Sequence, residues 1–307
     1  MMTAWQDGGG QAGDVDETVD KIAPPAPVTT RFAPSPTGRL HLGHAWSAIL
    51  AHDLARAAGG RFLLRIEDID GTRSRPEHVD AILADLAWLG LGWDDAVVFQ
   101  SQRLGLYAAA LDRLRGMGLV YRCFCTRAEI AASAAAPHGS DGAVYPGTCR
   151  GVSDGEARAD EPHCWRLDMA AAVARTGRLS WHDAHASTVE ADPLAAGDVV
   201  LARKDAPSSY HLSVVVDDAA QGVTDIVRGT DLFAATHVHR VLQALLGLPT
   251  PRYHHHPLLV GSDGARLAKR HDSPALAALR LAGEDGHALA NALRSGRFPL
   301  GFGVAAS

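Results

Sequence analysis

The chain has 307 residues, 47% of which are hydrophobic, and its formal net charge at pH 7 is −6. That length suffices for about two domains with a large buried core. No apolar run approaches the roughly 18–20 residues of a membrane-spanning helix, and the N-terminus lacks the apolar stretch of a signal peptide, so we expect a cytoplasmic protein without a membrane partner. Five acidic residues and one basic residue lie within residues 1–30, which leaves −2 for the rest. Binding of RNA would therefore need a local basic surface.

Strands and helices are expected to alternate through the first half of the chain. The first 27 residues are rich in Gly, Asp and Pro without hydrophobic periodicity, which predicts a disordered tail. Beyond it, apolar periodicity with Gly and Pro at the boundaries predicts two strand–helix units. Their elements are a strand near Val28–Ala33, a helix over about 43–58, a strand at Arg61–Ile66 and a helix from Pro76 to about Leu89. Such alternation indicates a doubly wound parallel α/β sheet.

A motif between the first strand and the first helix, RFAPSPTGRLHLGH at residues 31–44, is typical of a phosphate-binding site. Two prolines stiffen the turn, and two glycines remove side chains where a nucleotide could lie against the backbone. Two histidines sit one turn apart at the helix start, where free N–H groups and the helix dipole favour phosphate. These residues are Pro34, Pro36, Gly38, Gly43, His41 and His44.

The alternation breaks near Tyr121 and resumes near Asp198, which indicates an insertion between two halves of a nucleotide-binding fold. All four cysteines fall within it. Cys123, Cys125 and Cys149 could deliver three thiolates to one tetrahedral Zn²⁺, and four protein ligands would make that zinc structural. The residues alone leave the fourth ligand open among Cys164, His163, His138 and Tyr145. Small buried thiols that pack a strand are the alternative interpretation.

The second half repeats the strand and helix signals. A short strand is predicted at Cys164–Asp168 within the insertion. After the insertion, strands are predicted at Val199–Arg203, Ser213–Val216, Val223–Val227 and around Leu258–Val260, and helices at Ala235–Leu246 and near 274–282 and 286–294. After the last strand, a Gly-flanked loop at 261–264 leads into Arg266-Leu267-Ala268-Lys269-Arg270. A cationic loop of this kind suits a mobile clamp on a leaving pyrophosphate.

Polar residues at the ends of predicted strands are candidates for binding a small substrate, because ligands of open α/β sheets bind at the carboxyl ends of the strands. Glu67 could hold an ammonium group, although a helix cap or a surface pair with Arg73 would also explain it. Tyr210 and Arg228 can point into the same crevice; singly, they could equally be a core aromatic residue and a surface cation. Arg31 is a second cation for a carboxylate, which a guanidinium can bind with two parallel hydrogen bonds.

The two motifs together resemble the HxGH and KMSKS-like signatures of class I aminoacyl-tRNA synthetases. With RIEDID at 65–70 and SVVVDDAAQGVTDIVRGTDL at 213–232, the resemblance over roughly 30–280 extends to the catalytic core of glutamyl-tRNA synthetases. It implies an α/β Rossmann-like fold with ATP, accompanied by Mg²⁺, and L-glutamate as substrates. The implied catalytic residues are His41, His44 and Lys269, and the implied ATP-binding residues are Pro34, Ser35, Gly38, His41, Gly43, His44, Arg266 and Lys269. The implied glutamate-binding residues are Arg31, Ser35, Glu67, Tyr210 and Arg228.

The chain resembles one subfamily closely, the glutamyl-queuosine tRNA(Asp) synthetases. The chain shares its C-x-C and Tyr-x-x-x-Cys spacing, and 37 residues follow Arg270, which is too few for the helical anticodon-binding domains. The resemblance implies a structural Zn²⁺ on Cys123, Cys125, Tyr145 and Cys149. It also implies activation of glutamate without tRNA, then esterification of queuosine at the wobble position of tRNA(Asp), whose anticodon stem-loop would enter the active site of a monomer. Ala268 stands where the family has serine, which predicts slower adenylation.

Two other functions stay open from the sequence: a truncated synthetase that charges the acceptor end of tRNA(Glu), and an inactive paralogue that binds RNA or metal. The predicted organisation is a disordered acidic tail (1–29), the first half of the nucleotide-binding fold (30–120), an inserted zinc-bearing subdomain (121–195), the second half with the KMSKS-like loop (196–273) and a short C-terminal helical segment (274–307).

Overall fold

A computed structural model describes residues 27–126, 128–130, 144–152, 161–261, 275–299 and 302–305. Most of the predicted tail, His138 and the RLAKR loop lie outside these residues. The strands of the central sheets are β1 (Thr29–Phe32), β2 (Arg61–Ile66), β3 (Asp94–Phe99), β6 (Ser180–Asp183), β7 (Ser187–Glu190), β9 (Asp225–Gly229) and β10 (Arg252–His256). The remaining strands are β4 (Val120–Cys123), β5 (Cys164–Leu167), β8 (Val200–Ala202), β11 (Leu259–Gly261) and β12 (Phe302–Val304).

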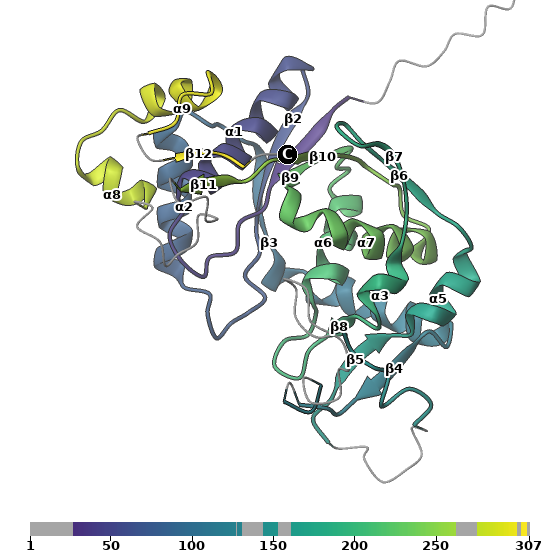
Figure 1. The fold of residues 1–307 in the computed structure, drawn as a ribbon. Coiled ribbons are helices and arrows are strands. Elements are labelled where there is room, and N and C mark those ends of the chain that lie inside the picture. The colour runs from purple at the N-terminus through teal and green to yellow at the C-terminus, as the bar shows by residue number, and fades with distance from the viewer. Residues whose placement is uncertain are drawn as a thin grey trace, which may run out of the picture.

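Two sheets meet at the centre of the molecule (Figure 1). The first is parallel, in the order β1-β2-β3, and the second has the order β7-β6-β10-β9, with β10 parallel to both β6 and β9. Strand β7 is antiparallel to β6. The sheets join where the Thr224 N–H, just before β9, donates to the Thr29 carbonyl of β1 at 2.9 Å. The carboxyl ends of β1, β2, β9 and β10 therefore border one crevice.

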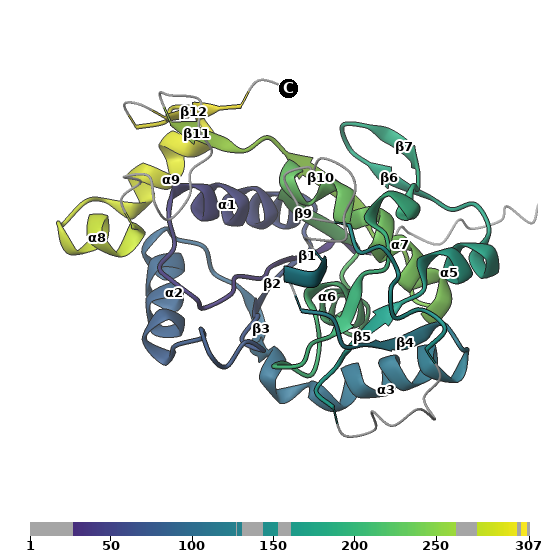
Figure 2. The ribbon, with the colours of Figure 1, turned by 60° about the horizontal axis from the view of Figure 1, so that its bottom comes forward.

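Helices cover both sides of these strands, with α1 on one side and α6 on the other (Figure 2). The α-helices are α1 (Leu42–Ala57), α2 (Pro76–Trp88), α3 (Leu104–Gly116), α5 (Met169–Thr176), α6 (Tyr210–Ala220), α7 (Phe233–Leu246), α8 (Leu276–Leu281) and α9 (Gly286–Arg294). Short 3₁₀ turns occur at Gln100–Gln102, Pro193–Ala196 and Thr230–Leu232. No helix within the described ranges is long and apolar enough to cross a membrane.

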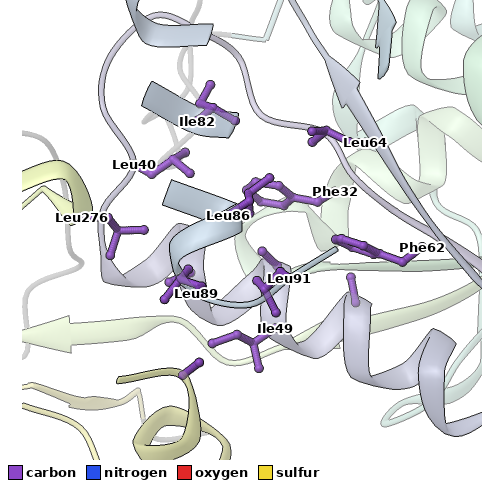
Figure 3. Close-up of a cluster of buried hydrophobic side chains, with 14 of the residues drawn as sticks. Phe32, Leu40, Ile49, Phe62, Leu64, Ile82, Leu86, Leu89, Leu91 and Leu276 are labelled. Atoms are coloured by element: carbon purple, nitrogen blue, oxygen red, sulfur yellow. The ribbon is translucent and has the colours of Figure 1, made fainter. Parts of the chain in front are cut away.

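The largest hydrophobic core lies between α1, α2 and the first sheet (Figure 3). Its labelled members are Phe32, Leu40, Ile49, Phe62, Leu64, Ile82, Leu86, Leu89, Leu91 and Leu276. Side chains from α3, α6 and α7 form a second core that includes Leu114, Leu212 and Val241. Burial on both faces explains why RFLLRI shows no alternation of polar and apolar residues: every residue from Phe62 to Ile66 is buried, including Arg65.

The predicted doubly wound α/β class is confirmed, and most predicted elements match within a few residues. The strand predicted at Ser213–Val216 is wrong, because these residues lie inside α6. A short buried run of valines does not distinguish a strand from a helix by periodicity. Six of the described strands, β3, β4, β6, β7, β10 and β12, had no counterpart among the predicted elements.

A third sheet, in the order β4-β5-β8, carries the cysteine region. Its β8 strand falls within the predicted second half of the nucleotide-binding fold, whereas β6 and β7 fall within the predicted insertion and yet pair in the β10 sheet. Sheet pairing thus divides the chain differently from the boundaries predicted at 121–195 and 196–273.

Candidate active site

A cavity of about 430 Å³ opens at the carboxyl ends of β1, β2 and β9. Its lining includes ten residues that the sequence singled out: Arg31, Pro34, Ser35, Gly38, His41, Gly43, His44, Glu67, Tyr210 and Arg228. The other two residues predicted for ATP, Arg266 and Lys269, lie outside the described residues. The structure therefore brings the nucleotide motif and the candidate amino-acid pocket to one cavity, and the role of each residue there stays a prediction.

The histidine pair at the start of α1 has a defined proton arrangement. His41 is the N-cap, and its Nδ1 accepts from the Gly43 N–H at 3.1 Å, while Nδ1 of His44 accepts from the His41 N–H at 3.2 Å. An imidazole nitrogen that accepts a hydrogen bond carries no proton, so each neutral ring carries its proton on Nε2. The two rings lie 3.9 Å apart between centroids. Both side chains can thus donate from Nε2 to phosphate oxygens.

A buried charge cluster supports the opposite wall of the cavity. The carboxylate of Asp218 on α6 accepts from Nε of Arg31 at 3.0 Å and from Nη1 of Arg65 at 2.8 Å. Burial opposes ionisation of Asp218, but the two guanidinium groups outweigh it and lower its pKa. Glu67, 3.4 Å from Nη2 of Arg65, behaves differently: burial raises its pKa against the opposing effects of Arg65 and Arg31. A substrate ammonium group would compensate the charge of Glu67 in the cavity.

Replacing Asp218 with asparagine should destabilise the protein by about 3 kcal/mol, because it leaves two buried guanidinium groups short of a negative charge. The value is at the low end for a broken buried pair, since Glu67 and Asp217 also lie near Arg65. Urea unfolding of D218N against wild type measures it. The matched control is D112N, which removes an exposed partner of Arg115 and should cost less than about 1 kcal/mol. Equal losses in the two variants would contradict this account of the cluster.

Arg228 occupies the deep end of the cavity among neutral acceptors. Its guanidinium donates to the Tyr210 hydroxyl at 3.1 Å, to Oγ1 of Thr236 at 2.6 Å and to Nε2 of His255 at 3.1 Å. Burial raises the pKa of Tyr210, so this hydroxyl stays protonated at neutral pH. Thr236, His255 and Asp218 are site-supporting residues that the sequence did not indicate: Thr236 and His255 belong to no recognised motif, and the motif at 213–232 that contains Asp218 assigns it no role.

A second cavity of about 1180 Å³ adjoins the first, and the two share Ser35, Glu67 and Tyr210 in their linings. Its far side includes Cys125 and Tyr145. The candidate amino-acid pocket thereby adjoins a larger space that reaches the cysteine region.

The three cysteines predicted as metal ligands lie together. The Sγ atoms of Cys123, Cys125 and Cys149 are all within 4.8 Å of one another, and Cys125 Sγ is 3.5 Å from Cys149 Sγ and 3.7 Å from the Tyr145 hydroxyl. Zn–S bonds of about 2.3 Å place the sulfurs of a tetrahedral site roughly 3.8 Å apart, so this spacing suits Zn²⁺.

The candidates for the fourth metal ligand are separated by the structure. Tyr145 lies at the cluster, where its hydroxyl also accepts from the Cys149 N–H at 2.8 Å. Cys164 donates its thiol to the Cys123 carbonyl at 3.5 Å and is not in the group of mutually close ligand atoms. His163 is half-buried beside Phe124 and Trp165, has Nδ1 2.9 Å from the Glu161 carbonyl and is not in the group of mutually close ligand atoms. Tyr145 therefore fits the cluster better than either of these two.

Comparison with known proteins agrees with this geometry. A family sequence model described as "tRNA synthetases class I (E and Q), catalytic domain" matches residues 27–302. A glutamyl-Q tRNA(Asp) synthetase of Rhodobacter capsulatus is 54% identical over 267 residues, which are 83% of this chain and 95% of that protein. One of Symbiobacterium thermophilum is 47% identical over 263 residues, covering 82% of this chain and 81% of that protein.

Among solved structures, a glutamate tRNA ligase from Elizabethkingia meningosepticum in complex with its amino acid superimposes with a TM-score of 0.67 and 26% identity. The match covers 80% of this chain, which spans about half (52%) of that ligase. The extent of the family match and the identity of these relatives show that the chain belongs to the class I tRNA synthetases (E and Q), among the glutamyl-Q tRNA(Asp) synthetases, and that it is a ligase.

Proposed function

We propose that this ligase activates L-glutamate with ATP, without tRNA, and then transfers the glutamyl group to the cyclopentenediol of queuosine at the wobble position of tRNA(Asp). The observation that carries the proposal is the single cavity lined both by the histidine pair and by Arg31, Glu67 and Arg228. That combination provides donors for phosphate beside two cations and one anion for an amino acid with two carboxylates. The names of the relatives supply the acceptor RNA.

In the first step, an α-carboxylate oxygen of glutamate attacks the α-phosphate of ATP in line, and pyrophosphate leaves. The chain's contribution is positioning and charge compensation. His41 and His44 donate from Nε2 to phosphate oxygens, Lys269 stabilises the charge that develops on the leaving pyrophosphate, and Mg²⁺ accompanies ATP. Arg31 and Arg228 bind the side-chain carboxylate of glutamate, and Glu67 binds its ammonium group.

In the second step, a hydroxyl of queuosine attacks the carbonyl carbon of the adenylate, and AMP leaves. The adenylate phosphate accepts the hydroxyl proton, so the step needs no further base from the protein. The second cavity supports this step, because it meets the first at Ser35, Glu67 and Tyr210 and gives the nucleoside a route to the glutamyl carbonyl.

The proposed structural Zn²⁺ is held by Cys123, Cys125, Tyr145 and Cys149. The spacing of the three thiols and the tyrosine hydroxyl supports it. The guanidinium of Arg166 lies 3.9 Å from the centre of the Tyr145 ring, a cation that favours a metal-bound phenolate.

The function is tested by incubating the protein with ATP, labelled glutamate and one of three RNAs: tRNA(Asp) bearing queuosine, tRNA(Asp) bearing guanosine in its place, or tRNA(Glu). We expect label on the first RNA and on neither of the others, and glutamate-dependent ATP–pyrophosphate exchange without any RNA. Label on tRNA(Glu) would replace the proposal with acceptor-end charging. A protein that forms neither adenylate nor labelled RNA would be an inactive paralogue.

Replacing Lys269 with alanine should slow ATP–pyrophosphate exchange roughly 10²-fold, because a cation that acts on charge developing in the transition state is lost. Exchange kinetics at saturating glutamate measure the effect. The matched control is K21A, a lysine of the predicted tail, which should exchange at the wild-type rate. Unchanged exchange in K269A would remove the RLAKR segment from the catalytic machinery.

A further inference from the structure

Arg228 is a buried cation whose hydrogen-bond partners are all neutral. Its side chain comes from β9, and the residue is 5% exposed. The acceptors are Tyr210, Thr236, His255 and, at 3.4 Å, Nδ1 of His239. Within the described ranges of the chain, no carboxylate forms an ion pair with it. Removing a cation from water without a counter-ion is costly, so this arrangement keeps the charge of Arg228 available for an anion that enters the cavity.

The partner on the Nε side of Arg228 is a histidine whose protonation is determined by the geometry. A guanidinium only donates, so Nε2 of His255 must accept from Arg228 and carries no proton. The proton of the ring is therefore on Nδ1, which lies 2.7 Å from Oδ2 of Asp183. Burial, and then the charge of Arg228, lower the pKa of His255 to about 4, which agrees with a neutral ring at physiological pH.

Asp183 is itself fixed by the backbone. Its Oδ1 accepts from the N–H groups of His185 and Ala186 at 2.9 and 3.0 Å, and its Oδ2 accepts from the His255 N–H at 3.2 Å. The three side chains sit on neighbouring strands, because β10 lies between β6 and β9 and His255 is paired in register with Arg228. A rigid line of contacts thus runs from Asp183 through His255 to Arg228.

We propose that Asp183 and His255 are positioning residues for substrate glutamate: Asp183 holds His255 in the Nδ1–H form, and Nε2 of His255 orients the guanidinium of Arg228 toward the cavity. The inference rests on the proposed function, in which Arg228 binds the glutamate side-chain carboxylate. Because the imidazole of His255 lies between them, Asp183 orients Arg228 without contacting it. The carboxylate of Asp183 therefore does not compete with the substrate for the guanidinium.

The variant D183N tests the proton arrangement without changing the shape of the side chain. The oxygen of asparagine should stay on the His185 and Ala186 N–H groups, which turns the amide nitrogen toward His255 Nδ1. Nδ1 of His255 must then accept a hydrogen bond from the amide nitrogen, so the ring proton moves to Nε2. The Nε2–H of His255 and the Nε–H of Arg228 then face each other. In ATP–pyrophosphate exchange we expect KM for glutamate to rise roughly 30-fold or more, as for loss of a hydrogen bond to a charged group, with KM for ATP within about twofold.

A double-mutant cycle shows whether Asp183 acts through His255. Glutamine has one fixed oxygen that can accept from Arg228 and no tautomers, so in H255Q the added D183N change should raise KM for glutamate much less than it does alone. The matched control is H254Q: His254 is the next residue on β10 and pairs with Asp225 at 2.8 Å, away from Arg228. It should keep KM for glutamate within about twofold of wild type.

The outcomes separate this inference from the function on which it rests. A glutamate-specific rise in KM in D183N that is reduced in the H255Q background supports it. Wild-type exchange with an unchanged KM in D183N, equal rises in KM for glutamate and ATP, or full additivity with H255Q overturns it and leaves the proposed function standing. A wild-type protein without glutamate-dependent exchange overturns both. Circular dichroism of each variant identifies misfolding. If D183N misfolds, H255F, which removes the acceptor for Arg228, should raise KM for glutamate well above that of H254Q, and an unchanged KM overturns the inference.

Discussion

The variant R228Q should lose roughly 10²–10³-fold in kcat/KM for glutamate in ATP–pyrophosphate exchange. The magnitude follows because truncating one partner of a buried, hydrogen-bonded charge pair costs about 2–5 kcal/mol, and each 1.36 kcal/mol is a factor of ten. In the free protein the same change removes a buried cation that has no ion-pair partner among the described residues, so it should cost little stability. The measurement is exchange kinetics with glutamate varied at saturating ATP, together with a thermal melt.

Two further variants separate charge from geometry. R228K keeps the charge but loses the planar fork that donates to Tyr210, Thr236 and His255, and we expect an intermediate loss. The matched control is R240Q on α7, whose Nε donates to the Ser180 carbonyl outside the cavity, and its exchange should stay within about twofold of wild type. If R228Q were within threefold of wild type, Arg228 would not bind the substrate carboxylate.

The nucleotide motif was predictable because its signals are local. Proline, glycine and two histidines at fixed spacing require a turn and a helix start whatever the rest of the fold does, and the structure has α1 beginning at Leu42 with His41 as N-cap. The buried strand β2 was predictable for the same reason, since its apolar residues Phe62, Leu63, Leu64 and Ile66 lie between the helix-ending Gly59-Gly60 and the acidic residues Glu67 and Asp68. Local chemistry of this kind also identified the three clustered thiols.

The residues that hold the site's side chains in place were not predictable, because their contacts depend on which strands and helices become neighbours. Asp183 and His255 are 72 residues apart, and β10 reads as the polar string RYHHH although Tyr253 and His255 are buried. Asp218 lies in the motif at 213–232, which assigns it no role, yet from α6 its carboxylate joins Arg31 to Arg65. Long-range pairing between charged side chains leaves no periodic trace in the sequence.

Replacing Cys123 or Cys149 with serine should greatly weaken zinc binding. A structural zinc site needs all four ligands, and its binding energy is also folding energy for the surrounding segment. Wild type should hold about one Zn²⁺ per chain. Each variant should lose at least about 10²-fold in zinc affinity, because changes to residues that merely orient a metal ligand already cost roughly 10–100-fold. Chelator competition at fixed pH measures affinity, and thermal unfolding measures the loss of stability.

The matched control is C164S, because the Cys164 thiol contacts the Cys123 carbonyl and lies outside the group of mutually close thiols. It should keep its zinc, whereas Y145F should bind zinc more weakly than wild type. Zinc loss in C164S with normal binding in Y145F would make Cys164 the fourth ligand instead.

The position of the cysteine cluster predicts which activity depends on zinc. Cys125 and Tyr145 line the cavity that adjoins the amino-acid pocket rather than the pocket itself, so loss of zinc should reduce transfer of glutamate to RNA more than it reduces ATP–pyrophosphate exchange. An equal loss of both activities would mean that the cysteine region supports the whole fold and not the RNA-facing cavity in particular.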